Sequence, residues 1–263
     1  MKKASLGVLL LFFGFAGKAQ YNETIRTARP GIAIGPFAVG KNVLQIQSGV
    51  RFGGFNEDQT MFTGNFFAPI SVFRFGITEH IDLNTAWQYR AENFEQGGAT
   101  SDKSGLSIST IGARINLYEG KNHIPAMGLQ LIFQPNILSD AYNPDHASFR
   151  VVAIAGEKLG HNFSILANIS AGTNGNTNNL GWQYALSLDY NLPGKWRTYI
   201  ETYGALANAS STLNWDTGLA YLVNNDLSLD LFGGIGSNNG RVDYFASAGV
   251  SWRYVKWRKQ GLR

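Results

Sequence analysis

Apolar and polar residues alternate with a period of two along most of this chain. In WQYALSLDYNL, which runs from Trp182 to Leu192, every second residue is aromatic or aliphatic, and most of the residues between them are polar. Successive side chains of a β-strand point to opposite faces, so this spacing predicts strands with one apolar and one polar face. Helical periodicity is hard to find. The pattern therefore favours an all-β fold.

About twelve strands are predicted in this way. The clearest of them span 43–52, 81–90, 127–134, 163–170, 182–192, 214–223 and 244–254. Two other segments break the pattern. In 66–76 neither face is wholly apolar, and Pro69 suggests a bulge or a strand that begins later, because proline cannot donate to a ladder. In 106–117 the apolar phase slips near Thr110 and Ile111.

The connecting segments add a second pattern, because long and short ones alternate. Segments 53–65, 91–104 and 136–146 are long, whereas 77–80, 118–123 and 158–161 are short. Outer-membrane barrels have short periplasmic turns and longer extracellular loops. Strands can cross lipid only as a closed barrel, with the apolar face outward. We therefore expect a single antiparallel transmembrane β-barrel of outer-membrane type over residues 43–255. The alternative is an exported β-sandwich, which also alternates.

The two ends of the chain lack this alternation. Residues 1–19 have the basic start, apolar run and small residues before position 20 that are typical of a signal peptide, so we expect export. Residues 20–42 contain several prolines and glycines and are expected to fold into the periplasmic mouth as a partial plug. A disordered lead-in is the alternative for them. Residues 256–263 form a basic C-terminal tail, expected near anionic headgroups and not at a nucleic acid.

Aromatic residues on the apolar face are expected near the membrane interfaces, where rings form girdles. The predicted lipid-facing or girdle residues are Trp87, Tyr89, Trp182, Tyr184, Tyr190, Trp215, Tyr221, Trp252 and Tyr254. The opposite assignment, with the polar face toward lipid, is disfavoured, because an Arg or Lys on the lipid face at mid-bilayer costs roughly 2–4 kcal/mol.

Charged residues on the polar face are candidates for the lumen. The predicted pore-lining residues are Arg51, Asp82, Arg90, Arg114, Asp189, Glu201, Asp216, Asp230 and Arg253. Both signs of charge occur among them. Because a charged ring selects ions only when one sign dominates, the charges either line a weakly selective pore or pair across the lumen and close it.

Several motifs resemble those of a known family. They are TARPGIAIGPFAVGKNVLQIQSG from Thr27, FRFGITEHIDL from Phe73, WRTYIETYG from Trp196, WDTGLAYLVNNDLSLDLFGGIG from Trp215 and DYFASAGVSWRY from Asp243. Over nearly the whole mature chain they resemble the outer-membrane transporter family named after the meta pathway of phenol degradation. The resemblance implies an outer-membrane β-barrel that passes small compounds, hydrophobic ones included. Gln47 departs from the acidic residue expected there, so a role for charge at that position is not carried over.

We expect passive passage of small solutes across a bacterial outer membrane. The expected partners are outer-membrane lipid, the solutes and the barrel-insertion machinery, with no nucleic acid, no cofactor and no enzymatic activity. The alternatives are a closed structural or surface-interaction barrel and an outer-membrane hydrolase. His146 and Ser148 stand two apart, which resembles the outer-membrane phospholipases, but no orienting partner follows from spacing. The four histidines lack metal-ligand spacing, so neither catalytic nor metal-binding residues are assigned.

Overall fold

A computed structural model of the chain describes residues 24–57, 61–177, 179–206, 212–238 and 241–255. The predicted signal peptide at 1–19 and the basic tail at 256–263 lie outside these residues. Within the described ranges, no helix has the length and apolar character needed to cross a membrane.

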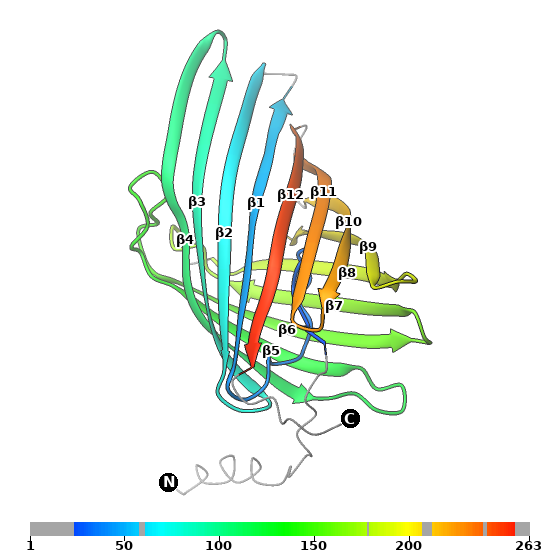
Figure 1. Cartoon of the computed structure of the whole chain (residues 1–263). Coiled ribbons are helices and arrows are strands. Elements are labelled where there is room, and N and C mark those ends of the chain that lie inside the picture. Colours follow the sequence, from blue (N-terminus) through cyan, green and yellow to red (C-terminus); the bar gives the residue numbers. More distant parts are fainter. Residues whose placement is uncertain (1–23, 58–60, 178, 207–211, 239–240, 256–263) are drawn as a thin grey trace, which may run out of the picture.

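Twelve antiparallel strands close into one barrel (Figure 1). Each strand pairs with its neighbours in the chain, and β12 closes the barrel on β1, from Val43 opposite Val255 to Glu57 opposite Arg241. The strands are β1 (Val43–Glu57), β2 (Phe62–Gly76), β3 (Ile81–Gln96), β4 (Ala99–Tyr118), β5 (Ala126–Gln134), β6 (Ser148–Leu159), β7 (Phe163–Gly172), β8 (Gly181–Asn191), β9 (Trp196–Leu206), β10 (Leu213–Asn224), β11 (Leu227–Asn238) and β12 (Arg241–Val255). The predicted twelve-stranded antiparallel barrel is confirmed. We call the end that holds Val43 and Val255 the lower end.

The wall of the barrel differs in height around its circumference. Strands β1 to β4 rise above the others at the upper end (Figure 1), and β4 has 20 residues where β5 has 9. Three rings hold these tall hairpins together, because the centroid of Phe55 lies 4.9 Å from that of Phe62 and 6.2 Å from that of Phe94. Pairing stabilised by such contacts continues beyond the height of the other strands.

The predicted long loops at 53–65 and 91–104 are therefore wrong. β1 continues to Glu57, β2 begins at Phe62, and β3 and β4 are separated only by Gly97 and Gly98. Both glycines have positive φ, 58° and 85°, which a tight turn requires and which glycine adopts without strain. The polar residues of 91–104 pair across the hairpin in place of forming a loop; Asn93 Nδ2 donates to Asp102 Oδ1 at 2.7 Å. Of the three segments predicted to be long loops, the connection between β5 and β6 is the one that is long in the structure.

Pro69 lies inside β2, and the strand begins earlier than the sequence suggested. Its register with β1 is unbroken, whereas pairing with β3 omits Ala68 and Pro69 without a change of register. The missing N–H of proline explains an interruption of the ladder without a bulge.

The bulge lies one strand further, between β3 and β4. Gln88 pairs with Ile108 and Tyr89 with Leu106, so that Ser107 is an extra residue. An extra residue exchanges the two faces of a strand beyond it. The bulge therefore accounts for the loss of the apolar phase that the sequence showed in this segment.

The two faces of the wall are inverted relative to a water-soluble protein. The most deeply buried side chains include Gln45, Asp82 and Glu201, each at 1% exposure or less, whereas Leu231 and Ile235 are 61% and 64% exposed. Charged residues are almost never fully buried unless they are paired, so the interior has to supply partners for them. An apolar outer surface around a polar interior is the arrangement of a barrel that spans lipid.

Candidate functional site

The lumen brings most of the predicted pore-lining residues into a buried polar interior. Seven of the nine are at most 8% exposed, and Arg51 and Arg90 are half-buried. The buried seven are Asp82, Arg114, Asp189, Glu201, Asp216, Asp230 and Arg253. Glu201 and Asp216 are direct cross-strand partners, as are Asp82 and Arg114. That these residues line a conducting pore stays a prediction.

The aromatic residues predicted to meet lipid are on the outer surface. Six of them are between 42% and 52% exposed, namely Trp87, Tyr89, Trp182, Trp215, Trp252 and Tyr254. Tyr184, Tyr190 and Tyr221 are half-buried. Two of these three pack on neighbouring rings, Tyr190 on Phe163 at 4.6 Å and Tyr221 on Trp196 at 4.7 Å. Their contact with lipid also stays a prediction.

Residues 24–42, which we call the inner segment, follow the inside of the barrel wall at its lower end. Near β11 and β12 the segment is held by Arg29, whose Nη2 and Nε lie 2.9 and 3.2 Å from the two carboxylate oxygens of Asp230. Nη2 also donates to Ser247 Oγ at 3.1 Å, and Thr27 Oγ1 lies 2.7 Å from Ser251 Oγ. A bidentate, charge-assisted pair of this kind fixes orientation as well as position.

Two glycines provide the space for this pair. Gly49 and Gly249 are opposite each other in β1 and β12, and a Cβ added to either would overlap the Arg29 guanidinium. A side chain at either position would therefore displace the arginine. The absence of side chains at these two positions leaves room in the wall for the Arg29 guanidinium.

The centre of the inner segment binds to β9 and β7. The amides of Ile32 and Ala33 donate to Glu201 Oε1 and Oε2 at 2.6 and 2.7 Å, so one carboxylate accepts two successive backbone N–H groups. Beside it, the amide of Ile34 donates to Asn168 Oδ1 at 2.8 Å, and Asn168 Nδ2 donates back to the carbonyl of Ile34 at 3.0 Å. The segment thus satisfies its backbone groups with inward-facing wall side chains, as a strand would with a neighbouring strand.

The end of the inner segment binds to the opposite wall. The amide of Val39 donates to Asp82 Oδ2 at 3.1 Å, and Asp82 also forms a buried ion pair with Arg74. Arg114 donates to the carbonyl of Gly35 at 3.3 Å. Between residues 25 and 42 the segment therefore contacts side chains of β2, β3, β4, β7, β9, β11 and β12.

Sequence reasoning did not assign Arg29 or Arg74 to the lumen. Arg74 lies in the strand whose alternation was unclear, and Arg29 precedes the first strand, where no face can be assigned. The available signal was their position in the motifs TARPG and FRFG, which carried the family resemblance.

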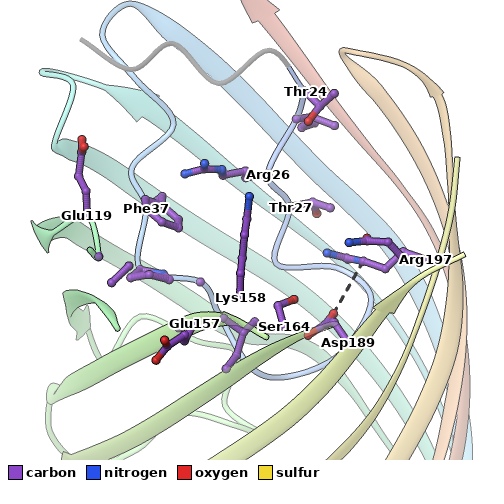
Figure 2. A pocket seen from close by; sticks show the side chains of 18 of the residues that line it. Thr24, Arg26, Thr27, Phe37, Glu119, Glu157, Lys158, Ser164, Asp189 and Arg197 are labelled. Carbon is purple, nitrogen blue, oxygen red and sulfur yellow. Dashed lines mark ion pairs between the residues drawn. The ribbon is translucent and has the colours of Figure 1, made fainter. Parts of the chain in front are cut away.

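A cavity of about 820 Å³ opens below the inner segment (Figure 2). Arg26 and Phe37 of the segment line it, together with Lys158, Asp189 and Arg197 of the wall. Asp189 and Arg197 face each other there, with Oδ1 and Nε 3.8 Å apart. The lower end of the lumen thus contains a polar cavity bordered by the inner segment and the wall.

Neither a metal site nor a hydrolytic pair stands out in the described residues. No group of three or more His, Asp or Glu side chains in them is arranged to hold a metal ion. His146 is exposed in the connection before β6, whereas Ser148 is buried at the start of that strand. The lumen, which gathers the buried charged residues, is the candidate functional site.

Comparisons with known proteins agree with the architecture. The chain is similar to an outer membrane channel from Pseudomonas putida F1, with 11% identity and a TM-score of 0.69 over 83% of this chain and 98% of that one. It is also similar to the β domain of the Bordetella autotransporter BrkA, with 7% identity and a TM-score of 0.57 over 81% and 100%. The KdgM porin in complex with disordered oligogalacturonate has 9% identity and a TM-score of 0.50 over 79% and 99%. At these identities the likeness concerns the fold.

A comparison of the sequence itself is more specific. Residues 27–254 match the model of the family described as "Putative MetA-pathway of phenol degradation". The match includes Arg29, all twelve strands in whole or nearly so, and every wall residue that holds the inner segment. No protein of curated function matches the chain in sequence.

Proposed function

Because the chain belongs to the family described as "Putative MetA-pathway of phenol degradation", we propose that it is a bacterial outer-membrane channel for the passive passage of small solutes, hydrophobic ones included. The observation that carries the proposal is the closed barrel with a charged interior inside an apolar outer surface. Two proteins of similar fold, described as an outer membrane channel and a porin with oligogalacturonate, support it. No step of the proposal requires catalysis.

The lower end is proposed to face the periplasm, with the inner segment as a partial plug of the periplasmic mouth. Removal of a signal peptide at residue 19 would leave the segment attached just below the barrel, and Val43 begins β1 at that end. The tall hairpins of β1 to β4 would then project outward from the cell surface. The basic tail at 256–263 would follow β12 on the periplasmic side.

The outer face is proposed to meet lipid. Leu219 is 44% exposed on β10, between Thr217 and Tyr221. An arginine there would cost roughly 2–4 kcal/mol at mid-bilayer. Leu219→Arg is therefore expected to fold poorly into lipid vesicles while Leu219→Ala folds, as measured by protection of the barrel from protease. Equal folding of the two variants would contradict the proposed lipid face.

A closed structural or surface-interaction barrel is the second candidate. It is favoured by the number of strands that the inner segment reaches, since a segment bound on all sides can close the lumen. The two functions differ in solute flux. The mature chain from Gln20 would be refolded into liposomes and challenged with a pentose and with a tetrasaccharide. Swelling in the pentose alone supports a narrow channel, whereas no swelling in either, with insertion confirmed, supports the closed barrel.

A further inference from the structure

The upper half of the lumen is lined by phenylalanine rings. Four of them, which we call the ring track, are Phe55, Phe66, Phe245 and Phe232 on the inner faces of β1, β2, β12 and β11. The first three are half-buried, whereas Phe232 is covered by its neighbours and is 4% exposed. Phe55 pairs with Asp243 near the upper rim, Phe66 and Phe245 both pair with Gly53, and Phe232 pairs with Ser247 below them. Along β12, six residue steps separate Asp243, at the height of Phe55, from Gly249, beside Arg29. This corresponds to about 20 Å along the strand.

Every ring of the track has an arginine beside it. The guanidinium carbon of Arg241 lies 4.5 Å from the centroid of Phe55, and that of Arg90 lies 4.1 Å from Phe66. The guanidinium carbon of Arg51 lies 4.4 Å from the centroid of Phe245 and 5.6 Å from that of Phe232, which Arg29 of the inner segment also approaches, at 5.2 Å. These distances are within the range of cation–π attraction. The track is therefore both aromatic and cationic along its length.

Glycines on the neighbouring strands make room for the rings. A Cβ added to Gly53 would lie 2.7 Å from the ring of Phe66, and one added to Gly234 would lie 2.7 Å from the ring of Phe245. A Cβ at Gly64 would overlap the ring of Phe55. Three rings of the track therefore pack where the adjacent strand has no side chain, which keeps them close to the wall.

Arg51 differs from the other two arginines of the track in its charge environment. Arg90 Nη2 lies 2.8 Å from Glu92 Oε1, and Arg241 Nη2 lies 3.1 Å from Asp243 Oδ1. For Arg51, by contrast, the described residues place no carboxylate oxygen within 4.0 Å of the guanidinium. Its charge is thus available to a ligand at the foot of the track, one level above the inner segment.

We propose that the ring track binds small aromatic carboxylates, with the ring of the ligand on Phe245 or Phe66 and its carboxylate on Arg51. Offset or edge-to-face packing of rings is favourable, and a guanidinium binds a planar carboxylate through two parallel hydrogen bonds. The site therefore prefers molecules that carry both an aromatic ring and a carboxylate. This inference rests on the proposed channel function, for which it names a class of solute.

The first test compares three probes that separate ring from charge. Benzoate carries both, benzyl alcohol carries the ring, and acetate carries the charge. Each would be equilibrated by dialysis against the refolded mature chain in nanodiscs, with protein-free nanodiscs subtracted to remove partition into lipid. Benzoate is expected to bind at least about tenfold more tightly than either of the other two, a difference of about 1.4 kcal/mol. Equal binding of benzoate and acetate would overturn the role of the rings.

The second test compares two arginines of the same lumen. Arg51→Gln is expected to remove the tenfold preference for benzoate over benzyl alcohol. Arg150→Gln is the matched control, because Arg150 shares the inner face of β6 with Val152 and no ring contact to it is found among the described residues. Loss of the preference in both variants to the same extent would overturn the assignment to Arg51.

Binding and passage are measured separately, so the two proposals can fail independently. If liposomes swell in the pentose but benzoate shows no preference in dialysis, the channel stands and the ring track does not. If benzoate binds through Arg51 but no solute enters, the site stands in a closed barrel and the channel function fails.

Discussion

The two halves of the lumen share the same twelve strands but differ in what their side chains contact. In the lower half, buried side chains such as Glu201 and Asp230 bind the inner segment, so charges and amides of the wall are satisfied by the chain itself. In the upper half, rings lie against glycines, and Arg51 contacts rings while no carboxylate oxygen of the described residues lies within 4.0 Å of its guanidinium. The wall side chains of the lower half thus bind the inner segment, whereas those of the upper half contact mainly one another.

The difference follows from what buried polar groups require. Polar groups in a buried interior need partners, and leaving them without any is costly. The inner segment supplies these partners below. Above, the arginines lie beside rings at distances within the range of cation–π attraction. If the two halves are independent, a substitution in one should leave the other unchanged.

The largest effect is expected from breaking the anchor of the lower half. Arg29→Gln leaves Asp230, whose side chain is 1% exposed, without its cation. Removing one partner of a buried pair costs roughly 3–5 kcal/mol. Hydrogen exchange of the amides at 31–34 should therefore accelerate by two orders of magnitude or more, at roughly tenfold for each 1.4 kcal/mol.

The matched change in the upper half is Arg51→Gln, which removes no hydrogen bond to the inner segment. Exchange at 31–34 should stay within about threefold of the parent, less than 1 kcal/mol. Equal acceleration in the two variants would show that the halves are not independent.

A smaller effect within the lower half is expected from Glu201→Gln. The amide offers one acceptor oxygen to the two N–H groups of Ile32 and Ala33, and its NH₂ group faces a donor. Hydrogen bonds to charged groups contribute roughly 1.5–3 kcal/mol, so exchange at these two amides should rise about tenfold to a hundredfold. Asp216→Asn, directly opposite in β10, is the control and should leave both amides protected. If the pore is open, Asp216→Asn should change the ion preference of the channel.

A still smaller and strictly local effect is expected at the tall hairpins. Phe62→Leu removes ring contacts with Phe55 at 4.9 Å and Phe94 at 5.9 Å. Aromatic pairs contribute roughly 0.5–1.5 kcal/mol each beyond area burial. Exchange should accelerate about tenfold at the tips of β1 to β3 and remain unchanged at 31–34. Acceleration in the inner segment would show that the upper wall supports the lower half.

The smallest effect is a titration at the upper rim. Tyr142, in the connection between β5 and β6, donates to Glu92 Oε2 at 2.9 Å. Burial, followed by this hydrogen bond, raises the pKa of Tyr142 to about 12. A raised tyrosine pKa favours the neutral form in the folded state, so the stabilisation is complete below pH 10 and is lost as the pH rises toward 12. Subtracting the tyrosinate absorbance of Tyr142→Phe from that of the parent isolates this group. A midpoint near pH 10 would contradict the contact.

Alternation alone predicted the strand number and the separation of faces, because both follow from local spacing. It failed at the hairpin tips. There Thr100, Ser101 and Asp102 have the composition of a loop, but cross-strand contacts keep them in β4. It also failed at Ser107, since one inserted residue cannot be located from a phase slip that extends over several positions.

The contents of the lumen were harder to predict than its wall. Asp82, Glu201 and Asp230 were predicted to face the lumen because they are charged, although only Asp82 lies in one of the clearest strands. Their partners, however, lie 43, 169 and 201 residues away in the inner segment, where no periodicity assigns a direction to a side chain. The Pro–Gly composition of that segment suggested a plug, but the atoms that Arg29 and Val39 contact depend on barrel closure.

The most direct test of the account is the single-channel conductance of the mature chain in a planar bilayer, compared with a variant that lacks residues 21–41. Insertion of both would be confirmed by protease protection. We predict a clear rise in conductance on deletion, because the inner segment lies inside the barrel and binds side chains of seven strands. Equal conductance of the two chains would contradict it, since the segment would then not limit passage.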